Sequence, residues 1–346
     1  MNKNWLKYNP EMDELYEKTL AILQKAKAST QKFVEVSPEL SQSNYFTRGA
    51  HAKSYAYVDA YFSPNQELVD ALGISDYFHE NQKLNIRFSN ANNVIEPGKK
   101  NFPAYGMSLK FEQVCYPLVN FPLFPTDDAH SFLELFNDLN EARIAQAKSG
   151  WDAVKEIPSL LVSGLKAFYH INPLNIGNLI WKGAQMEQDF LMNYAYHGIG
   201  CYRFGDYVAK LHTEKKDFEL LENENSDNLQ KTTLQQILDT QEIQFDLYIQ
   251  LGIDEETTPV NVLSKEWDQE KAAWQVLGTI TIPQQKVIEN NYTLENTSYS
   301  PFINPKAMQP VGRIQQTRKE IYQISLETRT KLNEKQGERE LKLKKE

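Results

Sequence analysis

The residues best suited to chemistry lie near the end of the chain, in the stretch RKEIYQISLETR at 318–329. On a helix that turns about 100° per residue, Tyr322 lies about 40° and Arg329 about 20° around the axis from Arg318. All three side chains therefore share one face, and Arg318 is one turn from the tyrosine hydroxyl. A guanidinium at that distance stabilises a phenolate, and tyrosinate is a known axial ligand of haem iron. The same spacing also occurs on interfacial helices, so this motif alone leaves both interpretations open.

A second candidate is the histidine of TRGAHAKSYAY at 47–57, which precedes a stretch that alternates small residues with tyrosines. A single histidine beside a strand is more often a hydrogen-bonded structural residue than a catalyst. A neutral imidazole can nevertheless take up and release a proton near neutral pH. The interpretation of His51 therefore depends on the motifs that accompany it.

The order of these motifs resembles that of the haem catalase superfamily. The matching motifs are RxxHAK (48–53), RFS (87–89), LKF (109–111), NxPxF (120–124) and RxxxY (318–322), with Arg329 seven residues after the tyrosine. Further matches are YRFGDYVAKLH (202–212), FDLYIQLGIDEETTPV (245–260), Glu266-Trp267 and WQVLGTITIPQQ (274–285). The resemblance covers roughly residues 45–333 and is to the short catalase-like branch of mini-catalases and catalase-related peroxidases. That branch lacks the flavodoxin-like carboxy-terminal domain of the large catalases, and we expect this chain to lack it too.

The resemblance implies haem b, with its iron, as the cofactor, and it assigns roles on both sides of the metal. Tyr322 would be the proximal iron ligand, and Arg318 would keep it a phenolate. His51 would be the distal base, hydrogen-bonded by Ser89. A neutral imidazole in that place could move a proton from one oxygen of a peroxide to the other.

The resemblance also implies how the porphyrin and the peroxide would be held. Arg48, Arg87 and Arg329 would bind the haem propionates, because bidentate pairing of guanidinium with carboxylate is favourable. Phe132 falls where the family places a phenylalanine against the porphyrin. Asn120 would supply the distal amide that orients the second oxygen of the peroxide.

Three positions depart from the pattern of the large catalases. Counting back from the proline, LVNFP has Val119 and Asn120 where LVGNNTP has two asparagines. Asn120 therefore matches either the catalytic asparagine or its neighbour. Tyr105 stands where the large enzymes usually have an arginine. Ala50 replaces the valine of catalases and the threonine of coral-type allene oxide synthases, which predicts a wider distal pocket.

These motifs predict a haem peroxidase or catalase that acts on hydrogen peroxide or small organic peroxides. The wider pocket keeps open a rival within the fold, a fatty-acid hydroperoxide lyase, isomerase or allene oxide synthase. A third hypothesis is a haem-binding protein without turnover. We expect a peroxide as substrate, a fatty-acid hydroperoxide or an organic electron donor as a further partner, and a monomer or homodimer.

The periodicity of apolar residues predicts an α+β fold, with a closed antiparallel β-barrel of about eight strands and surrounding helices. Helical spacing occurs at 11–30, at 130–148 after the candidate caps Thr126, Asp127 and Asp128, and from 313 onwards. Alternation typical of strands begins at 52 and recurs at 83–90, 104–114, 244–253 and 273–283. The apolar stretch 158–181 predicts a core helix and turn, and the polar stretch 214–231 predicts a surface excursion. We divide the chain into an N-terminal helix and arm (1–44), a haem-binding barrel domain (45–333) and a charged C-terminal tail (334–346).

The composition of the 346 residues excludes other classes of protein. A net charge of −9 without a basic stripe argues against nucleic acid as a partner. Two cysteines without CxxC spacing, Cys115 and Cys201, argue against a disulfide framework and predict two buried thiols. We find neither a secretory signal nor an apolar run long enough for a membrane span, so we expect a cytoplasmic protein.

Overall fold

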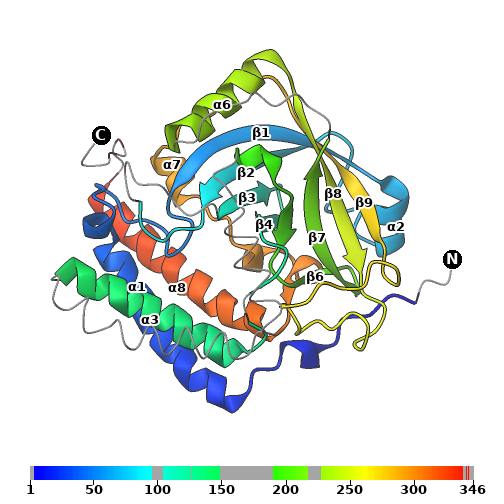
Figure 1. The fold of residues 1–346 in the computed structure, drawn as a ribbon, viewed down its shortest axis with the longest axis horizontal. Coiled ribbons are helices and arrows are strands. Elements are labelled where there is room, and N and C mark those ends of the chain that lie inside the picture. Colours follow the sequence, from blue (N-terminus) through cyan, green and yellow to red (C-terminus); the bar gives the residue numbers. More distant parts are fainter. Residues whose placement is uncertain are drawn as a thin grey trace.

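The computed structural model describes residues 4–95, 104–124, 126–148, 190–216, 227–337, 340 and 342. Within these ranges the chain forms an antiparallel β-barrel with long helices packed on one side (Figure 1). The predicted α+β class and the closed antiparallel barrel are confirmed. The apolar stretch 158–181 lies outside the described residues. No helix in the described ranges is long and apolar enough to cross a membrane.

Eight strands close the barrel, because β7 pairs with β5 on one edge and with β8 on the other. In barrel order they are β7 (Tyr207–Lys215), β5 (Tyr196–Gly198), β4 (Cys115–Val119), β3 (Tyr105–Lys110), β2 (Gln82–Asn90), β1 (Ser54–Pro64), β9 (Trp274–Ile282) and β8 (Ile243–Leu251). Two short strands, β6 (Cys201–Phe204) and β10 (Pro310–Val311), extend the sheet from β7.

The long helices are α1 (Glu17–Leu40), α3 (Ala129–Lys148) and α8 (Arg313–Gln336), and they pack against one another beside the barrel (Figure 1). The shorter α-helices are α2 (Gln66–Leu72), α6 (Asp227–Thr240) and α7 (Tyr292–Asn296). Single 3-10 turns occupy Pro10–Asp13, Leu191–Asn193, Pro301–Ile303 and Lys306–Met308. Of the three candidate caps, Asp128 caps the N-terminus of α3, because its carboxylate accepts a hydrogen bond from the backbone N–H of Ser131.

The barrel interior is apolar, as the alternating strand patterns predicted. In β8, Phe245, Leu247 and Ile249 are fully buried, while the residues between them are partly exposed. Because successive side chains of a strand point to opposite faces, polar residues of the same strands point to the outside of the barrel. The candidate site is built on that outer face. Cys115 and Cys201 are both buried free thiols, as predicted.

Two predicted boundaries were wrong. The helix predicted at 11–30 begins at Glu17 and continues to Leu40, because the chain is extended at Tyr16 and because Phe33 and Val34 are fully buried beyond the predicted end. Within it, the Thr30 hydroxyl bonds back to a carbonyl of its own helix. The polar stretch 214–231 is not wholly a surface excursion, since its first residues complete β7 and its last residues begin α6.

Candidate functional site

A cavity of about 300 Å³ lies between the outer face of the barrel and α8. His51, from the loop before β1, and Tyr322, from α8, both line this cavity. Arg318 and Phe132 line it as well, and Ala50 lies in the wall beside the imidazole. The fold thus brings together residues from opposite ends of the chain.

His51 is held in an unusual backbone conformation, with φ of 52°. This left-handed region is sparsely populated by residues other than glycine. Arg87, which is 2% exposed, donates a hydrogen bond of 2.6 Å from Nη2 to the His51 carbonyl. Ser89 Oγ lies 3.1 Å from His51 Nδ1 and orients the ring. The conformation is therefore fixed by side chains of β2.

The pKa of His51 is lowered to about 3, first by burial and then by the guanidiniums of Arg87, Arg318 and Arg48. The imidazole is therefore neutral at physiological pH. A neutral imidazole offers one nitrogen that donates and one that accepts a proton.

The strand register explains why the ring fits against the barrel. Ser89 pairs with Gly106, and Gly106 pairs with Val119, so these three residues form one row across β2, β3 and β4. A Cβ atom on Gly106 would lie 2.7 Å from His51 Nδ1 and 2.7 Å from Ser89 Oγ. Such distances are well below van der Waals contact. The imidazole therefore packs directly against the backbone of Gly106, where a larger residue would clash with it.

The register of this row also determines where the Asn120 side chain lies. Val119 lines the cavity, whereas among the described residues Asn120 lines neither this cavity nor the neighbouring one. The Asn120 side-chain oxygen accepts a hydrogen bond of 2.8 Å from the backbone N–H of Tyr105. Of the predicted site residues, Ser89 reaches the cavity through its contact with His51, and Asn120 is not brought to it.

On the opposite wall, Arg318 Nη2 donates a hydrogen bond of 3.2 Å to Tyr322 Oη. This is the contact that helical spacing predicted for the pair. Arg318 is itself held by Gln315, whose Oε1 accepts a hydrogen bond of 2.6 Å from Nη1. Gln315 also donates to the backbone carbonyl of Ile199, which ties α8 to the loop between β5 and β6. The Phe302 ring packs edge-on against Tyr322, with 5.4 Å between the ring centroids.

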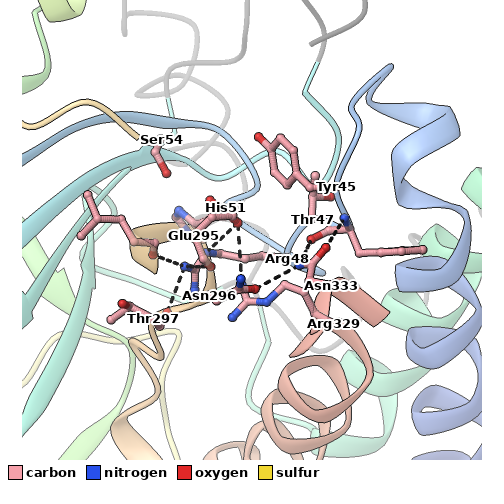
Figure 2. A network of polar contacts seen from close by, with 12 residues as sticks. Tyr45, Thr47, Arg48, His51, Ser54, Glu295, Asn296, Thr297, Arg329 and Asn333 are labelled. Atoms are coloured by element: carbon pink, nitrogen blue, oxygen red, sulfur yellow. Dashed lines mark hydrogen bonds and ion pairs between the residues drawn. The ribbon is translucent and has the colours of Figure 1, made fainter. Parts of the chain in front are cut away.

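Arg48 and Arg329 lie together around the buried carboxylate of Glu295, which is 1% exposed (Figure 2). Glu295 Oε1 is 3.3 Å from Arg48 Nε and 3.8 Å from Arg329 Nη1. Arg48 Nη2 also donates to three backbone carbonyls around the end of α7. From α8, the Asn333 amide exchanges hydrogen bonds with the backbone of Phe46, which fixes the segment that carries Arg48.

This cluster is rich in positive charge. Burial and the neighbouring Arg48 lower the pKa of Arg329 to about 9, although Glu295 opposes the shift. In the described part of the chain, Nε of Arg48, Nε of Arg329 and Oε1 of Glu295 are buried without a hydrogen-bond partner. Buried polar atoms are normally paired, so the unpaired guanidinium N–H groups, unlike the Glu295 oxygen, mark a place suited to an additional anion.

Three residues of the site were missed by sequence reasoning: Gly106, Glu295 and Gln315. Only the glycine gave a signal, because glycine inside a strand often marks a close approach of another group. Glu295 and Gln315 act through contacts between segments far apart in the sequence, which spacing does not reveal.

Comparison with known proteins supports the architecture. No family model matches the chain, and neither does any curated protein sequence. Solved structures of catalases do match it, which shows that the chain has the catalase fold. Catalase A from Saccharomyces cerevisiae is 15% identical with a TM-score of 0.60, and the match covers 83% of this chain and 62% of that one.

Two other catalase structures give similar values. A fungal catalase is 16% identical with a TM-score of 0.58, over 82% of this chain and 59% of that one. A bacterial catalase is 15% identical with a TM-score of 0.56, and the match covers 83% of this chain and 57% of that one. The chain thus spans less than two thirds of the length of these catalases. The resemblance read from the motifs is confirmed at the level of the fold.

Proposed function

We propose that the cavity binds haem b and that the protein processes peroxides, as a catalase or peroxidase. The observation that supports this most strongly is that His51 and Tyr322 line one cavity from opposite walls. A haem between them would have a neutral imidazole on one side and a phenol, hydrogen-bonded by Arg318, on the other. Tyrosinate is a recognised axial ligand of haem iron.

The charges around the cavity fit the same group. Apart from Arg318, which faces Tyr322, the cavity is lined by Arg48, Arg87 and Arg329 with three positive charges, and among the described residues in contact with them Glu295 contributes one negative charge. The remaining two positive charges match the two propionates of haem b. Charge-assisted hydrogen bonds from these guanidiniums to carboxylates would also supply acceptors for the buried unpaired N–H groups of Arg48 and Arg329.

The bound haem would supply the iron that cleaves the peroxide O–O bond and stores the oxidising equivalents. The side chains of this protein would orient the peroxide and move its proton. Ser89 holds Nδ1 of His51, which leaves Nε2 to accept a proton from one peroxide oxygen and return it to the other. The low pKa of His51 keeps that nitrogen unprotonated at neutral pH.

The distal role of His51 can be tested in the haem-loaded protein. We expect His51→Ala to retain haem but to lose peroxide turnover, because the proton acceptor is removed. His79→Ala is the matched control, since His79 is exposed on the surface, and it should turn over peroxide at the wild-type rate. An unchanged rate in His51→Ala would refute the proposed role.

The reaction type is decided by a comparison of products. Oxygen evolution from hydrogen peroxide would identify a catalase, and oxidation of an added organic donor would identify a peroxidase. Rearranged or cleaved products from a polyunsaturated hydroperoxide would identify an isomerase, lyase or allene oxide synthase instead. A loaded protein that is inactive in all three assays would be a haem-binding protein without turnover.

A further inference from the structure

Arg87 is a buried cation in the wall of the cavity between the barrel and α8, the first cavity, and its hydrogen-bond partners are all neutral. Its Nε donates hydrogen bonds of 2.9 Å to Ser54 Oγ and 3.3 Å to Tyr57 Oη, and its Nη2 donates to the His51 carbonyl. In the described part of the chain, no carboxylate forms an ion pair with it. The charge of Arg87 is therefore not cancelled by the protein groups that hold it.

The hydroxyls of Ser54 and Tyr57 both reach Arg87 because β1 contains a bulge. Residues three apart on a regular strand point to opposite faces. In β1, however, Ser54 pairs with Ser89 and Tyr57 pairs with Arg87, with a register shift between Ser54 and Ala56. The extra residue of the bulge brings both hydroxyls to the outer face of the barrel, where they lie 3.0 Å apart. We call these two groups the hydroxyl pair.

Tyr57 lies behind the first cavity rather than in its wall. It is fully buried, and it is absent from the described residues that line the cavity. Its ring packs against that of Tyr299, with 6.3 Å between the ring centroids. Burial acts to lower the pKa of Arg48, yet this pKa is raised, because Glu295 and then Tyr57 stabilise the charged guanidinium. Tyr57 therefore acts on two of the arginines that line the cavity.

A neutral acceptor and a carboxylate have different effects on a buried guanidinium. A carboxylate such as that of Glu295 satisfies N–H groups and also cancels charge. A hydroxyl accepts the same hydrogen bond but leaves the positive charge in place. Because a buried charge without a counterion is costly, an anion that pairs with it is bound strongly. None of the contacts of Arg87 within the described residues uses Nη1, so this nitrogen remains for an anion in the cavity.

We propose that Ser54 and Tyr57 are positioning residues for an anionic ligand of the first cavity. The hydroxyl pair holds Arg87 in place through neutral acceptors, so that the full charge of the guanidinium acts on a carboxylate in the cavity. This inference rests on the proposed function, in which that carboxylate is a haem propionate. It assigns to β1 a part in binding that neither contacts the iron nor moves a proton.

Porphyrins without iron test the proposal, because Tyr322 has no metal to bind in them. The probes are protoporphyrin IX and its dimethyl ester, and their affinities are measured by porphyrin fluorescence. We expect the wild type to bind the diacid at least about tenfold more tightly than the diester. Tyr57→Phe should reduce this ratio by about tenfold and Ser54→Ala by about threefold, because a charged group loses one of its acceptors.

The controls separate positioning from a structural role. Each variant removes one hydroxyl oxygen, and a merely structural defect would weaken the binding of diacid and diester equally. Tyr61→Phe removes a hydroxyl from an exposed tyrosine of the same strand and should keep the wild-type ratio. If Tyr57→Phe does not fold, Ser54→Ala decides the question alone. Equal losses for the two porphyrins, or an unchanged ratio in Ser54→Ala, would overturn the proposal.

Failure of this inference can be told apart from failure of the proposed function. A protein that takes up hemin and decomposes peroxide, but keeps its preference for the diacid in both variants, retains the proposed function and loses this inference. A protein that loses the preference in both variants, but neither ligates the iron of hemin nor decomposes peroxide, supports the positioning role and loses the proposed function.

Discussion

Gly106→Ala should displace the distal histidine without touching the groups that would hold the haem. The added Cβ would lie 2.7 Å from His51 Nδ1 and 2.8 Å from Cε1. Ordinary carbon contacts are about 3.5 Å or longer, so the ring must move by roughly 0.7 Å or more. A misplacement of about 1 Å in an active site can cost about a hundredfold in rate. We therefore expect peroxide turnover per bound haem to fall by about 10- to 100-fold, or about 1.4 to 2.7 kcal/mol in the activation free energy.

The assay is peroxide consumption normalised to haem content, with haem content measured separately. Gly73→Ala is the control, because Gly73 has φ of +68° and a Cβ atom added there would have nothing within 4 Å. That change should cost about 1 kcal/mol of stability through backbone strain while leaving turnover per haem unchanged. Wild-type turnover in Gly106→Ala would refute the claim that His51 requires a residue without a side chain at position 106.

Three further outcomes are expected. Glu295→Gln should lower the free energy of unfolding by about 3 kcal/mol or more in denaturant titrations of the protein without haem, because buried guanidiniums lose their counterion. The control Asp59→Asn breaks an exposed pair with Lys83 and should lower the free energy of unfolding by less than about 1 kcal/mol. Equal losses of stability in the two variants would contradict the role of Glu295. Turnover per haem should stay level from about pH 8 to about pH 5, because the lowered pKa keeps His51 neutral, and a fall centred near about pH 6.5 would contradict this. Hemin affinity should decrease as the pH rises through about 9, where Arg329 loses its proton, while affinity for the dimethyl ester of protoporphyrin should change less.

Much of the fold could be predicted because alternation and helical spacing reflect burial directly. The faces of β8 follow from Phe245, Leu247 and Ile249, which are buried as the pattern required. The start of α1 could not be predicted, because Met12, Leu15 and Tyr16 fit the same helical spacing although they precede the helix. Its true extent depends on packing against α3 and α8, which no local pattern records.

Geometry alone could predict the candidate site only where one motif carried several residues, and the remaining lining residues followed from the family resemblance. Arg318 and Tyr322 are one turn apart, so helix geometry alone brought them together. Whether Val119 or Asn120 faces the cavity depends on a shift of one residue in strand register, because neighbouring residues of a strand point to opposite faces. Only the pairing of Gly106 with Val119 placed the valine in the row that faces His51.

The central claim is that Tyr322 is the proximal ligand of a haem held in the first cavity. It is tested most directly by titration of the purified protein with hemin, followed by absorbance spectroscopy of the ferric state. The account predicts one haem per chain with a five-coordinate, tyrosinate-type spectrum, and the loss of this spectrum in Tyr322→Phe. A protein that takes up no hemin, or a spectrum that Tyr322→Phe leaves unchanged, would contradict it.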